Sequence, residues 1–159
     1  MGLVEFITKL FGNKSQKDMR EIMPYVEKIK VVYDEIDQLD NDALRARSAE
    51  LMLRIQERVA DKKARIADLK ASFEDLEINK REKVYNEIDH IEKEVKTAYE
   101  DVLREILPEV FAIVKSTARR FSQNEEIEVT ATQMDRDLAA DSRFDFVEIE
   151  GDKAIYFNK

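Results

Sequence analysis

The 159-residue chain has no cysteine and no tryptophan, and it contains only three glycines, two prolines and one histidine. Without cysteine, neither disulfide bonds nor thiolate metal sites can form. Glycine and proline are the residues that most often end helices and build tight turns, so their scarcity favours long elements. Charged residues make up 39% of the chain and hydrophobic residues 43%, a balance typical of solvated helices rather than of a barrel or sandwich. We therefore expect a mainly α fold.

The chain also lacks an apolar run of the roughly 20 residues needed to cross a bilayer, and its first segment lacks the pattern of a signal peptide. The formal net charge of −8 argues against nucleic-acid binding, because phosphates repel an acidic surface. The charge is uneven, however. Residues 1–30 carry six Lys or Arg and four acids, a net of +2, which leaves −10 for the rest. The amino-terminal end is thus the part suited to an anionic surface.

No pattern for catalysis or nucleotide binding is found in the sequence. A phosphate loop requires G-x-x-x-x-G-K-[ST], and no two of Gly2, Gly12 and Gly151 stand five positions apart. Glu87 and His90 form an E-x-x-H pair, but a di-iron centre needs two such pairs and His90 is the only histidine. We therefore name no catalytic, cofactor-binding or metal-binding residue.

Residues 1–14 have the pattern of a short amphipathic helix that lies at an interface, with an apolar face and lysines nearby. Such a short helix is marginal in water and gains order on contact. The residues predicted to contact a membrane or a partner are Leu3, Phe6, Ile7, Leu10, Phe11, Lys9, Lys14 and Lys17. The alternative is that this apolar stripe packs on the protein's own core or on a second subunit.

Residues 15–55 are predicted to form two helices. The first begins near Ser15 as N-cap, and its apolar stripe is most simply core; Pro24 inside it should kink the helix or mark its true start. The second opens with Asp40 in an N-cap position. Apolar residues then recur on one side of it, at Leu44, Leu51 and Ile55.

Residues 44–106, which include the segment 56–101, contain neither glycine nor proline, and their apolar positions keep heptad-like spacing in two stretches. The first stretch is Ile66, Leu69, Phe73 and Leu76, and the second is Ile88, Ile91, Val95, Ala98 and Val102. Periodicity alone allows either one unbroken helix or an antiparallel, coiled-coil-like hairpin. Residues 102–121 then read as an amphipathic helix, whose stripe is Leu107, Val110, Phe111, Val114, Ala118 and Phe121, with Lys115, Arg119 and Arg120 away from it.

Residues 122–159 change period and predict a small β element at the carboxyl-terminal end. Residues 127–131 alternate apolar and polar side chains, as in a strand with one buried face. Residues 146–150 and 154–157 flank Gly151 and Asp152, which suit a type II′ turn. A short helix is expected near residues 135–140.

Three ordered blocks of the chain resemble the start of SecA, the motor ATPase of the bacterial preprotein translocase. That family opens with an F-G pattern and a D-x-x-R-like helix, continues with an L-R-A-(K/R)-(T/S)-x-E helix, and then has an L-L-P-E-A-F-A-V-V-R-E-A-(S/A)-R-R helix. Here the corresponding positions are Phe11 and Gly12, residues 44–48 with Glu50, and residues 107–112 with Arg119 and Arg120. In the common form of the family the second and third blocks nearly abut, so residues 56–101 would be an insertion.

The resemblance implies how the chain is organised. Residues 1–14 would be an amphipathic helix, 15–55 and 102–121 scaffold helices of the motor, 56–101 an inserted helical hairpin turning near Asn79, and 122–159 a small α/β segment leading toward a nucleotide-binding domain. The insertion must fold back as a hairpin if the blocks that flank it are to stay neighbours.

The resemblance also implies a function for the parent protein. The parent would use ATP and magnesium to drive preproteins through a membrane channel, while this fragment, which lacks the phosphate loop, would not hydrolyse ATP and would hold no cofactor. The implied partners are the channel, preproteins and an acidic lipid surface, with a homodimer also compatible, and the implied location is cytoplasmic, peripheral at the inner face of the membrane. The alternative is a free-standing helical adaptor or holdase-like chaperone, which would explain the composition but leave the three blocks as coincidence.

Overall fold

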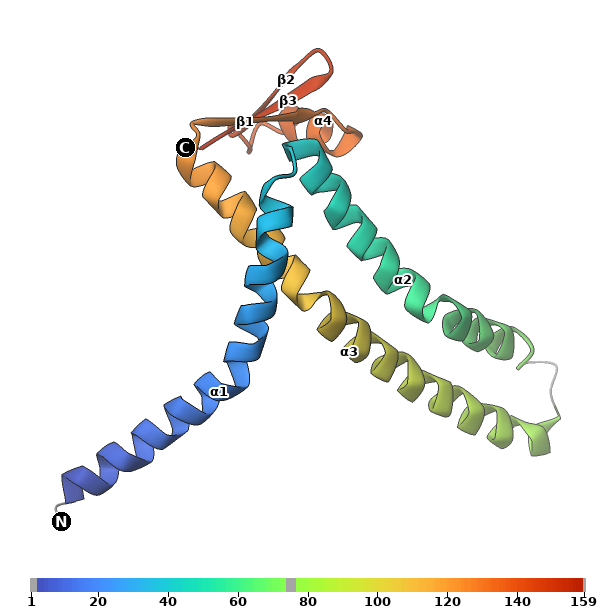
Figure 1. Cartoon of the computed structure of the whole chain (residues 1–159). Coiled ribbons are helices and arrows are strands. Elements are labelled where there is room, and N and C mark those ends of the chain that lie inside the picture. Colours follow the sequence, from blue (N-terminus) through green and yellow to red (C-terminus); the bar gives the residue numbers. More distant parts are fainter. Residues whose placement is uncertain (1–2, 74–76, 159) are drawn as a thin grey trace. The chain divides into compact units, whose positions relative to one another are not determined.

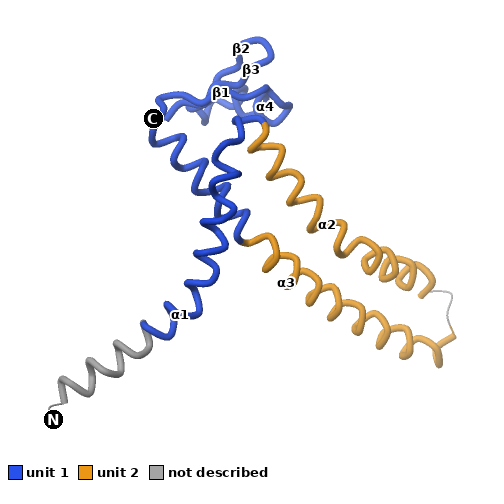
Figure 2. The backbone as a smooth tube through the Cα atoms, in the orientation of Figure 1, with its two compact units in different colours: residues 1–42, 108–159 blue, residues 43–107 orange. Residues whose placement is uncertain are grey.

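The computed structural model describes the backbone of residues 3–73 and 77–158, and the side chains of residues 16–73 and 77–158. In this part of the chain there are four helices and one three-stranded antiparallel sheet (Figure 1). The expected fold class is confirmed: helices dominate, two of them form a hairpin, and the β element comes at the carboxyl-terminal end. The chain divides into two compact units, residues 1–42 with 108–159 and residues 43–107 (Figure 2).

Helix α1, Leu3–Asp37, is a single element in unit 1. The prediction of a new helix with Ser15 as its N-cap is wrong, since Ser15 lies inside α1. Gly12 and Asn13 cost only about 1 kcal/mol or less each in a helix, which is too little to end it without a competing contact. Pro24 does not begin the helix either; it lies within α1 and leaves the carbonyl of Arg20 without its usual N–H partner. Figure 1 shows the axis of α1 changing direction part-way along its length, as expected of a helix with an internal proline.

Helix α2, Asn41–Ala71, begins directly after Asp40, as the N-cap prediction requires. Helix α3 is Ile78–Gln123. It contains Pro108, and from this residue onward the chain belongs to unit 1 again. The hairpin turns just before Asn79, which already belongs to α3, since α2 ends at Ala71 and α3 begins at Ile78. The polar run that follows Leu76 is rich in Glu, Lys and Arg, which favour a helix, so polarity alone did not mark the turn.

Within unit 2 the hairpin is held by an apolar seam and by ion pairs between its helices. Of the predicted seam residues, Leu69, Ile88 and Val102 are buried, and five more are half-buried. Arg65 pairs with Glu87 at 2.7 Å, near the connection between the helices, while Arg58 pairs with Glu105 at 2.8 Å. The residue number of the α2 partner falls from one pair to the other while that of the α3 partner rises, which is the pairing of an antiparallel hairpin.

The sheet of unit 1 has the order β1-β3-β2 and consists of β1 (Glu126–Thr130), β2 (Val147–Glu150) and β3 (Lys153–Phe157). Gly151 has φ 63° in the β2–β3 turn, and Asp152 has no positive φ, which is the sign pattern of the predicted type II′ turn. One face of the sheet buries Val129, Val147 and Ala154 beneath helix α4, Gln133–Ala140.

Candidate functional site

The predicted contact residues at the amino terminus lie on α1, whose backbone is helical from Leu3 onward. The side chains of Leu3, Phe6, Ile7, Lys9, Leu10, Phe11 and Lys14 lie outside the described residues. Lys17 is described and is exposed. No helix in the described part of the chain is long and apolar enough to span a bilayer.

A cluster of polar side chains joins the end of α1 to α3 inside unit 1; we call Asp37, Asn41, Ser116, Arg119 and Arg120 the polar clamp. Ser116 is fully buried and donates a hydrogen bond to Oδ1 of Asp37 at 2.8 Å. Arg119 forms an ion pair with the same carboxylate at 2.7 Å. A hydroxyl and a guanidinium therefore compensate one carboxylate that lies between two helices, as a partly desolvated charge requires.

Arg120 completes the polar clamp by holding the short connection between α1 and α2. Its guanidinium donates to Oδ1 of Asn41 at 2.6 Å and to the backbone carbonyl of Leu39. The planar fork of arginine can serve several acceptors at once, which a lysine cannot do with the same geometry. The path of residues 38–41 is thus fixed from α3.

The electrostatics of the polar clamp favour a charged Asp37. Burial by itself pushes the pKa of Asp37 upward, but the hydrogen bond from Ser116 and the charge of Arg119 outweigh it and hold that pKa below its usual value. Burial, and then the negative charge of Asp37, raise the pKa of the nearby Tyr33. This is the arrangement of a structural ion pair, because the carboxylate is stabilised as an anion and is not poised to take up a proton near neutral pH.

The start of α2 also covers the outer edge of strand β1. The side-chain amide of Asn41 donates to the backbone carbonyl of Glu128 at 3.0 Å. Asp42 accepts from the backbone N–H of Thr130 at 2.9 Å and from its hydroxyl at 2.7 Å. Edge groups that a neighbouring strand would otherwise use are therefore occupied by side chains.

The apolar stripe predicted for residues 102–121 is largely exposed. The buried side of α3 in this region carries Ala112, Ile113 and Ser116. Phe111 and Val114 keep 55% and 60% of their surface exposed, and Val110 is also exposed; we call these three residues the α3 apolar face. Arg119 and Arg120 lie away from this face: Arg119 binds Asp37 at the end of α1, and Arg120 binds the connection that follows α1.

A shallow pocket of about 420 Å³ lies on the hairpin of unit 2 and includes His90. Glu94 in its lining accepts from Lys62 on α2 and pairs with His90 at 3.2 Å. The hydrogen bond and charge of Lys62 lower the pKa of Glu94, which makes this carboxylate a weaker base than an ordinary glutamate. No group of three or more metal-ligating side chains occurs among the described residues. The pocket thus offers an ion-paired surface and no arrangement typical of catalysis.

Sequence reasoning missed Asp37 and Ser116. The available signal was a serine on the same side of the third predicted block as Ala112 and Ile113, four residues before Arg120. A small polar residue at that spacing marks a helix side that packs against a polar partner.

Comparison with known proteins identifies the family of the chain. The model of the SecA DEAD-like domain matches residues 7–134. The chain belongs to the SecA family. Over 158 aligned residues, the chain is 58% identical to the protein translocase subunit SecA of Parabacteroides distasonis, 53% to that of Porphyromonas gingivalis and 57% to that of Bacteroides thetaiotaomicron.

Each of these alignments covers 99% of this chain and 14% of the relative, so the chain spans about one seventh of the SecA proteins that it matches. The comparison with solved structures found no match. Residues 56–101 lie within these alignments, so the segment is present in these SecA proteins as well. Membership of the family disfavours the alternative of a free-standing adaptor.

Proposed function

We propose that the chain is the amino-terminal part of a protein-translocating SecA motor, in which it serves as a scaffold and as a contact for the membrane or channel. The parent would couple ATP hydrolysis, with magnesium, to the export of preproteins. The ATP site would lie in the part of the parent outside these 159 residues. The parent would act on the cytoplasmic side, peripherally bound at the inner face of the membrane.

The observation that carries the scaffold role is the α3 apolar face. Contiguous apolar side chains on a helix surface usually mark a contact site, because their exposure to water is unfavourable. The polar clamp fixes this helix from its opposite side, so the apolar face is presented on a braced element. In a protein about seven times longer, the remaining motor is available to cover this face.

Membrane contact is proposed for α1 on different grounds. Residues 1–30 carry a net charge of +2 in an otherwise acidic chain, and the helical spacing of the first residues gives an apolar face, Leu3, Phe6, Ile7 and Leu10, with Lys9, Lys14 and Lys17 nearby. An interfacial helix of this kind binds by apolar insertion together with attraction to anionic lipid.

The scaffold role is tested with Phe111→Ser in two settings. In the 159-residue chain, Phe111 is exposed and the substitution should change the free energy of unfolding by no more than about 0.5 kcal/mol. In the full-length protein, where the face would be covered, truncating a buried phenylalanine costs about 3 to 5 kcal/mol, so the melting temperature and ATP-dependent export should both fall.

Leu53→Ser is the matched control, because Leu53 lies on the hairpin with 54% of its surface exposed and should be tolerated in both settings. Equal tolerance of Phe111→Ser in the full-length protein would reject the scaffold role of the α3 apolar face.

A further inference from the structure

The residues of α1 change from exposed to packed at Pro24. Every described residue before it, 16–23, is exposed. Three of these exposed residues are large and apolar: Met19, Ile22 and Met23. Tyr25 is the first half-buried residue, and burial increases along the helix until Ile36, which is only 1% exposed. Helix α1 therefore has an unpacked segment, residues 16–23, and an anchored segment, residues 25–37.

Contacts with α3 hold the anchored segment. The polar clamp binds its last residue, Asp37, through the hydroxyl of Ser116 and the guanidinium of Arg119. One turn earlier, the Nζ atom of Lys115 lies 3.8 Å from the centre of the Tyr33 ring, which is a cation–π contact between α3 and α1. The direction of residues 25–37 is thus set by α3.

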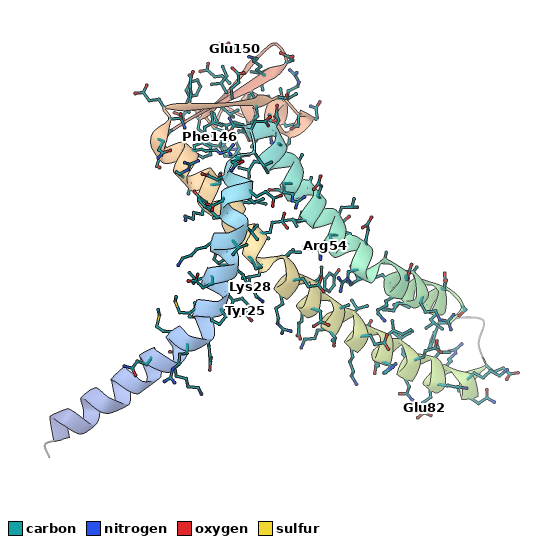
Figure 3. The ribbon with its side chains drawn as sticks, viewed as in Figure 1. Tyr25, Lys28, Arg54, Glu82, Phe146 and Glu150 are labelled. Carbon is teal, nitrogen blue, oxygen red and sulfur yellow. The ribbon has the colours of Figure 1, made fainter. Side chains whose placement is uncertain are left out.

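No side-chain hydrogen bond, ion pair or ring contact among the described residues joins the two segments across Pro24. Before it, the guanidinium of Arg20 donates to the carbonyl of Gln16 at 3.2 Å. After it, the Nζ atom of Lys28 lies 5.9 Å from the centre of the Tyr25 ring, and Figure 3 labels both residues on α1. Contacts between residues three or four apart stabilise a helix locally. Each segment therefore has such a contact, and the joint between them has none.

The backbone of α1 is also interrupted at Pro24. Proline has no N–H, so the carbonyl of Arg20 loses its helical hydrogen bond, and the proline ring crowds the same carbonyl. Long helices kink at prolines for this reason, and Figure 1 shows the change of direction in α1. A helix bends most easily where a hydrogen bond is missing and no side chains bridge the gap.

The second proline inside a helix has different surroundings. Pro108 of α3 is itself buried, and so are Ile106 before it and Ala112 after it. Packing on both sides of Pro108 holds the helix in one direction there. Only Pro24 separates a packed from an unpacked stretch of its helix within the described residues.

We propose that Pro24 is a hinge of α1. The unpacked segment changes its angle to the anchored segment, while the polar clamp and Tyr33 keep the anchored segment on α3. The predicted membrane-contact residues lie in the same helix, on the far side of the hinge from α3. Binding to anionic lipid selects the angles at which those residues lie along the surface, and α3 does not have to move. The membrane as the cause of this selection rests on the proposed function.

Pairs of spin labels on introduced cysteines measure the angle, because the chain has no cysteine of its own. Asp18→Cys with Asp34→Cys places labels on exposed positions on the two sides of Pro24. In a straight helix the α-carbons of these positions would be about 24 Å apart. Ser48→Cys with Ala64→Cys is the matched control, since these exposed positions have the same spacing on α2, which contains no proline.

Double electron–electron resonance should give a broad distribution of distances for the α1 pair and a narrow one for the α2 pair. Pro24→Ala restores the missing N–H and a good helix former, so it should narrow the α1 distribution to the width of the control. An α1 distribution as narrow as the control would overturn the hinge. A Pro24→Ala distribution as broad as the original would overturn it too, because the bending would then not depend on the proline.

Vesicles rich in anionic lipid test the selection of angles. Their addition should shift and narrow the α1 distribution and leave the α2 distribution unchanged. An unchanged α1 distribution in chains that sediment with the vesicles would overturn the role of the hinge in membrane contact. Chains that do not sediment with the vesicles would contradict the membrane contact itself, whereas the distribution in solution still decides whether Pro24 is a hinge.

The same α1 labels in the full-length protein, with any cysteines outside these 159 residues replaced by serine, test whether the unpacked segment stays unpacked. A broad distribution that narrows with vesicles is expected there as well. A narrow distribution without lipid would overturn the proposal, because the rest of the motor would then hold the segment in place.

Discussion

A buried hydroxyl at Ser116 links α3 to the carboxylate of Asp37, and this bond is the most enclosed contact of the polar clamp. Polar groups removed from water are stable only when paired, so the value of Ser116 lies in what Asp37 would lose without it. Arg119 shares the same carboxylate and would remain after the hydroxyl is removed.

We predict that Ser116→Ala lowers the free energy of unfolding by about 1 to 3 kcal/mol, because Asp37 loses a donor that water cannot readily replace. Urea unfolding followed by circular dichroism measures the change. Ser122→Ala is the control, since the hydroxyl of Ser122 is exposed and bonds only the preceding turn, at the carbonyl of Arg119.

The pKa of Asp37 provides a second measurement on the Ser116→Ala variant. The folded-state pKa of Asp37 is depressed, so its stabilisation is complete above the unfolded-state pKa and is lost as pH falls through the folded-state value. Removing the Ser116 donor should raise the folded-state pKa, which carbon-detected NMR titration of the carboxyl group reports. An unchanged pKa would mean that the hydroxyl does not hold the charge.

At the scale of elements, the hairpin is fixed by a seam that alternates between α2 and α3. Ile88 is 5% exposed in that seam, whereas Ile78 at the start of α3 is 84% exposed. The two isoleucines are on the same helix and differ strongly in burial, so Ile78 serves as the exposed control for Ile88.

Ile88→Ala should destabilise unit 2 by about 2 to 5 kcal/mol, because a buried isoleucine leaves both lost transfer energy and a cavity. Ile78→Ala should change stability by less than about 0.5 kcal/mol. Hydrogen exchange of amides in α2 and α3 measures the effect locally. Equal effects at the two sites would contradict the described seam.

Much of this element order could be predicted because it rests on local signals. The heptad spacing predicted the buried seam, the alternation at residues 127–131 predicted β1, and Asp40 predicted the start of α2. The hairpin itself needed more than periodicity, since one unbroken helix would show the same spacing.

The errors arose where several residues of similar propensity compete. Ser15 is a good N-cap only if the chain before it is not helical, and nothing near Gly12 is strong enough to end α1. The side of α3 that packs in this unit could not be read from hydrophobicity, because its more apolar side is the exposed one. That choice depends on tertiary partners, the polar clamp among them.

At the scale of the whole molecule, opposite charges are separated along the sequence. The chain has a net charge of −8, although its first 30 residues are positive. Attraction to anionic lipid should therefore be local to α1 and opposed by the rest of the chain, and it should weaken as salt shortens the screening length.

Sedimentation with vesicles rich in anionic lipid tests this distribution. Deleting residues 1–11 should abolish binding, since both the apolar anchor and Lys9 are lost. Replacing Lys9, Lys14 and Lys17 with glutamine should weaken it, while the same change at the exposed hairpin residues Lys63, Lys80 and Lys83 should not. Undiminished binding after the deletion would exclude α1 as the membrane contact.

The side chains of Asn41 and Asp42 on β1 also limit self-assembly. A sheet whose two edge strands are both unpaired can add further copies of the chain on both sides and grow into a fibril. Here the first residues of α2 bind the outer edge of β1. Because strands cannot then be added on both sides, the sheet cannot extend into a continuous fibril. The small β element is thus protected on its β1 side against acting as a seed for polymerisation.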